Sequence, residues 1–136
     1  IDTLESLGIE CDVKVFSFHH QPTEIVNFVN SAEDNGYVAF ICGTRMSANL
    51  TGVVSSHTIL PVIGVPLSTG TFNGMCSLYS TVQMQEGIPV ATVAIDNSTN
   101  AAILVGQMLA ITDENLADKL YTMRQQIREN YNKLNQ

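Results

Sequence analysis

The chain has 136 residues, a formal net charge of −7, 45% hydrophobic residues and only 14% charged residues. This length suits one domain with a single core, and the apolar, weakly charged composition excludes a mainly disordered chain. The acidic balance gives no attraction for phosphate backbones or anionic lipid, and no apolar run reaches the roughly 20 residues that span a bilayer. We therefore expect a cytoplasmic protein with neither nucleic acid nor a membrane as partner.

The first third of the chain shows two helices and two strands in alternation. Residues 2–7 before Gly8 are typical of the last turns of a helix closed by a glycine. Residues 11–18 are rich in strand formers, and they predict a strand that carries His19 and His20 to its carboxyl end. A helix with apolar residues at helical spacing is predicted from residue 22 to about 34, and an apolar strand from 37 to 42.

The same alternation continues to the end of the chain. It predicts two further strands, at 61–66 and 90–95. It also predicts four further helices: at 53–60, through Leu78 and Val82, at 101–111, and at 113–134, where Thr112 caps the last one. Apolar strands separated by helices indicate a parallel sheet covered on both faces. We therefore predict one three-layer α/β domain over residues 1–136, with ligands at the loops that follow the strands: 17–22, 43–52, 68–74 and 96–100.

The cysteines and histidines give no metal-binding pattern. Cys11, Cys42 and Cys76 stand far apart among apolar or small neighbours. Metal sites favour closely spaced Cys or His, and His19 and His20 would point to opposite faces of a strand. We predict reduced packing thiols and no metal site.

Several of the loop sequences are similar to one family. Ser17-Phe18-His19-His20-Gln21-Pro22 resembles the Ser-Ala-His-Arg-Thr-Pro loop of the PurE family, the carboxyaminoimidazole ribonucleotide mutases of purine biosynthesis. The similarity covers nearly the whole chain in order, and the 77–90 stretch resembles the bacterial class I branch. It continues through 31–37, 48–52, 61–66, 77–84, 87–90 and 100–102.

The resemblance implies a flavodoxin-like domain that assembles into an octamer, with sites where subunits meet. It implies an isomerase that moves a carboxylate from an exocyclic nitrogen to a ring carbon of an imidazole ribonucleotide, without metal or organic cofactor. His19 stands at the position of the family's histidine and would carry the proton. The implied substrate-binding positions are Ser17, His20, Gly43, Arg45, Ala48, Asn49, Leu50 and Ser68.

The chain also departs from the family pattern. The family begins with a strand and a Gly-Ser-x-Ser-Asp phosphate loop, and the chain starts after both. His20 replaces an arginine, Arg45 and Met46 bring bulk into a glycine-rich loop, and Asn49 replaces a histidine. Either an amino-terminal piece is missing, or the protein has diverged. Two other functions stay open: an inactive homologue with a structural or regulatory role, and an aminoimidazole ribonucleotide carboxylase or other lyase on the same scaffold.

Without the first strand, which is central in the flavodoxin order, the strands near Cys11 and Tyr37 would have unpaired edges. A second chain could donate a strand, or the two neighbours could pair directly. Both solutions favour a tight homo-oligomer or an assembly with a strand-donating homologue. A monodisperse monomer at micromolar concentration would contradict this prediction.

Overall fold

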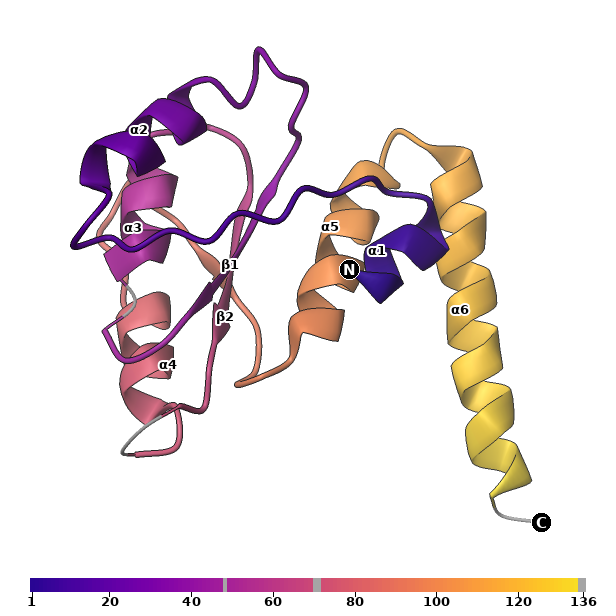
Figure 1. The fold of residues 1–136 in the computed structure, drawn as a ribbon. Coiled ribbons are helices and arrows are strands. Elements are labelled where there is room, and N and C mark those ends of the chain that lie inside the picture. The colour runs from indigo at the N-terminus through magenta and orange to yellow at the C-terminus, as the bar shows by residue number, and fades with distance from the viewer. Residues whose placement is uncertain (48, 70–71, 135–136) are drawn as a thin grey trace. The chain divides into compact units, whose positions relative to one another are not determined.

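The structure is a computed structural model that describes residues 1–47, 49–69 and 72–134 (Figure 1). The chain divides into two compact units, one formed by Ile1–Asp12 with Ala102–Gln136 and the other by Val13–Ala101. The single domain over residues 1–136 stays a prediction. Ala48, a predicted site residue, lies outside the described residues.

The unit of residues 13–101 is built on a parallel sheet. Its strands are β1 (Phe40–Thr44), β2 (Val62–Pro66) and β3 (Ala91–Thr92), in the order β1-β2-β3. β2 lies in the middle and all five of its residues are buried, as expected for an apolar strand covered by helices. The predicted parallel α/β fold is confirmed.

Three helices of this unit lie together on one side of the sheet (Figure 1). They are α2 (Pro22–Asn30), α3 (Asn49–Ser56) and α4 (Met75–Val82). α3 packs on β1 and β2, while α4 packs on β2 and β3. A cluster of buried side chains fills the space between strands and helices: Ile25, Val29, Cys42, Val54 and Val62.

α4 approaches the middle strand closely at Gly64. A β-carbon at Gly64 would overlap Cγ2 of Thr81, and Thr81 itself is fully buried. The Thr81 hydroxyl donates to the Ser77 carbonyl at 2.6 Å, and the Ser77 hydroxyl donates to the Thr44 carbonyl at 2.7 Å. Small and hydroxyl side chains thus let α4 lie directly on the sheet while their polar atoms stay paired.

The strand predicted at residues 11–18 is wrong. This segment is extended but pairs with no strand among the described residues, and Val13 and Val15 are exposed. Phe16 and Phe18 instead pack against the core cluster, with the Phe16 and Phe28 ring centroids 5.6 Å apart. A β-strand needs a neighbouring strand with which its backbone can form hydrogen bonds. In the part of the chain that the structure describes, β1 pairs with β2 alone, so β1 is not such a neighbour for residues 11–18.

Two other elements differ from the prediction in their bounds. β3 covers two residues of the predicted 90–95, although hydrogen bonds from Val93 N to the Gly64 carbonyl and from Asp96 N to the Pro66 carbonyl continue the contact with β2. α3 begins at Asn49, four residues before the predicted start, so the loop after β1 is shorter than expected. Both changes concern the carboxyl ends of the strands, where the site was predicted.

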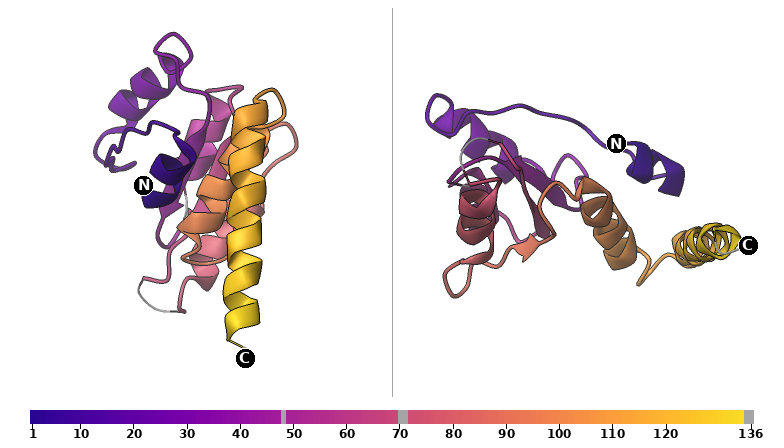
Figure 2. Two further views of the ribbon diagram at one scale, coloured as in Figure 1. Left: turned by 90° about the vertical axis from the view of Figure 1, so that its right-hand side faces the viewer. Right: turned by 90° about the horizontal axis from the view of Figure 1, so that it is seen from below.

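The other unit contains the short helix α1 (Asp2–Leu7) and the long helix α6 (Glu114–Lys133), and α6 runs without interruption (Figure 2). α1 ends at Gly8 with a φ of 77°, as predicted, and the Lys119 ammonium donates to the Leu7 carbonyl at 2.9 Å. The predicted Thr112 cap is wrong, because the Asp113 carboxylate accepts from Leu116 N at 3.0 Å. A carboxylate is the stronger acceptor at the positive end of a helix.

α5 (Ser98–Leu109) begins in one unit and continues in the other. Among the described helices, none is long and apolar enough to cross a membrane. All three cysteines are free thiols, but only Cys42 is buried. The packing role predicted for Cys11 and Cys76 is therefore wrong, since both side chains are exposed.

Candidate functional site

The loops after β1 and β2 are joined at the carboxyl end of the sheet. The Thr44 carbonyl accepts two hydrogen bonds, from Leu67 N at 2.9 Å and from the Ser77 hydroxyl at 2.7 Å. One turn further along α4, the Ser80 hydroxyl donates to the Met46 carbonyl at 3.2 Å. α4 therefore holds the start of the 43–52 loop against the end of β2.

Asp96 joins the loop after β2 to the loop after β3. Its carboxylate accepts from Ser68 N at 2.9 Å, and its own N–H donates to the Pro66 carbonyl at 2.9 Å. Hydrogen bonds from the hydroxyl and the backbone of Ser68 lower the pKa of Asp96. The predicted site residue Ser68 is thus fixed by a negative charge that the sequence analysis did not single out.

The loops at this end of the sheet have an unusual backbone conformation. Met46, Phe72, Asn73 and Asp96 all have positive φ, between 49° and 72°. Side chains other than glycine rarely adopt this region, and such residues concentrate at functional sites, where the surrounding structure maintains them. Three of the predicted ligand loops, 43–52, 68–74 and 96–100, therefore contain residues in this conformation.

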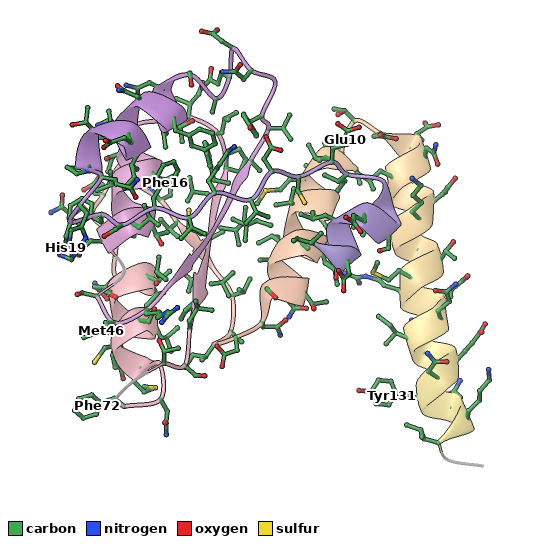
Figure 3. All side chains as sticks on the ribbon, in the orientation of Figure 1. Glu10, Phe16, His19, Met46, Phe72 and Tyr131 are labelled. Carbon is green, nitrogen blue, oxygen red and sulfur yellow. The ribbon has the colours of Figure 1, made fainter. Side chains whose placement is uncertain are left out.

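The turn that carries the histidines is closed by its own hydrogen bonds. The Ser17 carbonyl accepts from His20 N at 3.1 Å and from Gln21 N at 2.8 Å, and Ser17 N donates to Gln21 Oε1 at 3.2 Å. Ser17 Oγ and His20 Nδ1 are 2.7 Å apart. The exposed His19 ring is edge-on to Phe18, with ring centroids 5.4 Å apart, and points away from the sheet (Figure 3).

A hollow of about 360 Å³ lies along α3 and α4. None of the described residues that line it is charged. They come from the histidine turn, α3, α4 and the segment after α4: Phe18, Asn49, Gly52, Val53, Ser56, Ser80, Met84, Gln85 and Ile88. The hollow therefore brings the neighbour of His19 together with Asn49, the first residue of α3.

The other predicted site residues are spread over three places. Gly43 and Arg45 are exposed at the end of β1, and Ser68 is exposed beside Asp96. Leu50 is half-buried and packs against the core cluster. Among the predicted binding residues that the structure describes, only Asn49 lines the hollow, with Ser17, His19 and His20 in the adjoining turn.

Sequence reasoning missed two groups of residues. Met84, Gln85 and Ile88 line the hollow after the end of α4, and the only signal for them was the resemblance of that stretch to the family. Thr44 and Thr51, near the two ends of the 43–52 segment, have buried hydroxyls with no hydrogen-bond partner among the residues that the structure describes. Unpaired buried hydroxyls are rare in native folds, and no sequence pattern predicts which hydroxyls will be buried without a partner.

In the described part of the chain, no group of three His, Cys, Asp or Glu side chains could hold a metal ion. The polar atoms available to a ligand are backbone amides, hydroxyls and the side chains of Asn49, Arg45 and the histidines. Such a set can bind an anionic or amide-bearing small molecule and can move a proton at an imidazole.

A parallel sheet with helices, and with joined and strained loops beyond the carboxyl ends of its strands, defines a flavodoxin-like α/β protein. The chain belongs to the family described as AIR carboxylase, whose model matches residues 1–130.

Relatives of known name cover most of the chain. The N5-carboxyaminoimidazole ribonucleotide mutase of Thermotoga maritima is 41% identical over 127 residues, which cover 93% of this chain and 74% of that protein. The chloroplastic phosphoribosylaminoimidazole carboxylase of Vigna aconitifolia is 40% identical over 119 residues, 88% of this chain and 21% of that longer protein. The crystal structure of Treponema denticola PurE matches with a TM-score of 0.83 and 25% identity, covering 99% of this chain and 87% of that one.

Proposed function

We propose that this protein is an isomerase of de novo purine biosynthesis that converts N5-carboxyaminoimidazole ribonucleotide into the ring-carboxylated aminoimidazole ribonucleotide. The observation that carries the proposal is the 41% identity, over 93% of the chain, to a protein named as that mutase. The fold supports it, since a PurE structure covers 99% of the chain.

The reaction needs one group that first gives and then takes a proton. As the bond between the exocyclic nitrogen and the carboxylate breaks, carbon dioxide forms and the nitrogen accepts a proton from the group. The ring carbon then attacks carbon dioxide, a carbon–carbon bond forms, and the proton of that ring carbon returns to the group. No electrons are exchanged with a third molecule, and an imidazole suits both roles near neutral pH.

His19 is the proposed proton carrier. It lies in a turn that the Ser17 carbonyl and the Gln21 side chain hold in one conformation. Its neighbour Phe18 lines the uncharged hollow that adjoins this turn. The His19 ring is exposed and therefore accessible to a small molecule that binds beside this turn.

Binding of the ribonucleotide is assigned to the loops that surround this turn. Arg45 offers a planar cation to the phosphate, and His20, held by Ser17 at 2.7 Å, offers a second donor. Asn49 contributes amide hydrogen bonds in the hollow. The remaining proposed contacts come from Gly43, Ala48, Leu50 and Ser68. A homo-oligomer, which the family resemblance makes an octamer, and a cytoplasmic location belong to the same proposal.

The experiment follows a ¹³C label in the N5-carboxylate, with unlabelled bicarbonate in the solution. The isomerase is expected to place the label on the ring carbon, well above the non-enzymatic background in carbon NMR. Absence of product above that background would contradict the proposal and would favour the inactive homologue, for which substrate binding measured by calorimetry without turnover is the expected result.

A second candidate function is carboxylation of aminoimidazole ribonucleotide by free carbon dioxide. The family description and the name of the Vigna aconitifolia relative favour it. The same label separates the two reactions. A carboxylase would take ¹³C from labelled bicarbonate with aminoimidazole ribonucleotide as substrate, and it would not retain a label supplied on the exocyclic nitrogen.

A further inference from the structure

Ser68 and Asp96 form a pair of polar side chains at the carboxyl end of the sheet. Ser68 lies after β2 and Asp96 after β3, and both residues are exposed. Oδ1 of Asp96 accepts from Ser68 N at 2.9 Å, and the Ser68 hydroxyl also donates to this carboxylate. Both hydrogen-bond donors of Ser68, its N–H and its O–H, are therefore used by Asp96.

The neighbouring backbone amides are used within the protein as well. Leu67 N donates to the Thr44 carbonyl and Asp96 N donates to the Pro66 carbonyl, each at 2.9 Å. Loops that bind a phosphate do so with backbone N–H groups that point at the anion. The N–H groups of Leu67, Ser68 and Asp96 are not available for that purpose, although a loop rich in Ser, Thr and Gly suggests it.

The pair offers a ligand hydrogen-bond acceptors instead of donors. A carboxylate has about four acceptor positions, and Ser68 occupies two of them on Asp96. Its pKa is lowered by these bonds, so the carboxylate is charged at neutral pH and cannot donate. Ser68 Oγ retains its own lone pairs. A ligand group that contacts the pair must therefore be a donor, and an anionic group would be repelled.

Packing holds the pair in place before any ligand binds. A β-carbon at Gly74 would lie 3.0 Å from Cγ2 of Ile95 and 3.1 Å from Cα of Ser68, so the backbone at Gly74 packs closely against both residues. Asp96 has a φ of 59°, a region that Asp and Asn adopt more readily than most residues. A pair that is already ordered loses little conformational entropy when a ligand binds.

We propose that Asp96 and Ser68 bind the two ribose hydroxyls of the ribonucleotide, and that Asp96 selects ligands that carry this diol. A vicinal diol has two donors on adjacent carbons, which match the two acceptors of the pair. Carboxylates bind ribose hydroxyls in the same way in dinucleotide sites. The exocyclic amine is the reacting group, and the phosphate is assigned to Arg45, whose charge is opposite. The inference rests on the proposed function for the identity of the ligand, but its test needs no turnover.

The test measures the binding of two ligands by calorimetry at pH 7. One is aminoimidazole ribonucleotide, and the other is its 2′,3′-dideoxyribose analogue, which lacks the diol. The chains compared are the unmodified protein, Asp96→Asn, Ser68→Ala and Asp34→Asn. Asparagine tolerates the positive φ and can still accept from Ser68 N, but it is uncharged. Asp34→Asn is the matched control, because it removes the same charge from another exposed position.

We expect the unmodified protein to bind the ribonucleotide at least about tenfold more tightly than the dideoxy analogue, since hydrogen bonds to a charged group are strong. Asp96→Asn should reduce this ratio of affinities to about threefold or less, and Asp34→Asn should leave it unchanged. The ratio cancels any general effect of charge on the phosphate, which both ligands carry. Ser68→Ala should reduce the ratio by about threefold, which decides the test if circular dichroism shows that Asp96→Asn does not fold.

Equal affinities of the unmodified protein for the two ligands would overturn the inference. So would a ratio that folded Asp96→Asn leaves unchanged, or no binding of the ribonucleotide at about 1 mM. Transfer of the ¹³C label together with an unchanged ratio would refute the ribose contact and keep the isomerase. A ratio that collapses in Asp96→Asn, without label transfer by the unmodified protein, would support the ribose contact and refute the isomerase.

Discussion

Replacement of Gly64 by alanine would add a methyl group where α4 packs on the middle strand. The new β-carbon would overlap Cγ2 of Thr81, lie 3.0 Å from Cγ1 of Val90 and lie 3.4 Å from Cγ2 of Thr51. These atoms come from α4, the segment that leads into β3, and α3. β2 is paired on both sides, so its backbone has little freedom to move away from them.

The size of the effect follows from this crowding. Added methylene groups in a packed core cost typically 1–3 kcal/mol. With three neighbours contacted at once, we expect Gly64→Ala to lose about 3 kcal/mol of unfolding free energy. For a chain of this size, that corresponds to a fall in Tm on the order of 10 °C. Urea and thermal unfolding followed by circular dichroism, at one fixed protein concentration, measure both quantities.

Gly52→Ala is the matched control. Gly52 lies inside α3, and its added β-carbon would meet only the flexible end of Met84, at 3.4 Å from Cε. Alanine is favoured over glycine in a helix by up to about 1 kcal/mol. We therefore expect this variant to be as stable as the unmodified chain or slightly more stable.

Thr81→Ser should partly rescue Gly64→Ala. Serine lacks the methyl group that the new β-carbon would overlap, but it retains the hydroxyl that donates to the Ser77 carbonyl. The contact with Val90 remains, so we expect about 1–2 kcal/mol of the loss to return. A Gly64→Ala variant within about 0.5 kcal/mol of the unmodified chain, or no rescue by serine, would refute the packing argument.

Two further predictions concern ionisable groups. Burial raises the pKa of the Cys42 thiol to about 12. At pH 8, iodoacetamide should therefore alkylate the exposed Cys11 in the folded protein and leave Cys42 unmodified until urea is added. Mass spectrometry of the peptides measures both reactions, and alkylation of Cys42 together with Cys11 in the folded protein would contradict the prediction. Hydrogen bonds from Ser68 lower the pKa of Asp96 below its usual 3.8. The Asp96 carboxylate therefore stabilises the folded state above about pH 4. This stabilisation is lost as the pH falls through the lowered pKa that Asp96 has in the folded state. Asp96→Asn should therefore reduce the acid-induced fall in Tm more than Asp34→Asn, which removes the same charge from another exposed position; equal pH profiles would contradict this assignment.

The parts of the fold that local patterns specify were predicted well. β1 and β2 are apolar runs, and α2, α4 and α6 follow helical spacing with the expected proline, glycine or acidic residues at their ends. These signals act within a few residues of the chain.

Errors arose where the outcome depends on distant partners. The 11–18 segment has the composition of a strand, but β propensity reflects packing and pairing with a neighbour, and no neighbour is present among the described residues. The hollow likewise requires Phe18, Asn49 and Met84, three residues far apart in the chain, to meet. Neither result can be derived from local composition.

The candidate site and the roles of its residues stay predictions, but the structure shows which features of its loops the sequence could not reveal. Strained residues occur in the 43–52 and 68–74 loops, and their positive φ values could not be predicted because Met46 and Phe72 are not residues that favour that region.

The most direct test of the central claim compares His19→Asn with His57→Asn in the isomerase assay. His57 is also exposed, but its Nδ1 lies 2.9 Å from the Val53 carbonyl at the end of α3, and His57 is not among the described residues that line the hollow. General acid–base groups contribute typically 10²- to 10⁴-fold to rates, so we expect kcat to fall at least 100-fold for His19→Asn and to stay within about twofold for His57→Asn. Unchanged turnover by His19→Asn, with a normal Tm, would show that another group carries the proton.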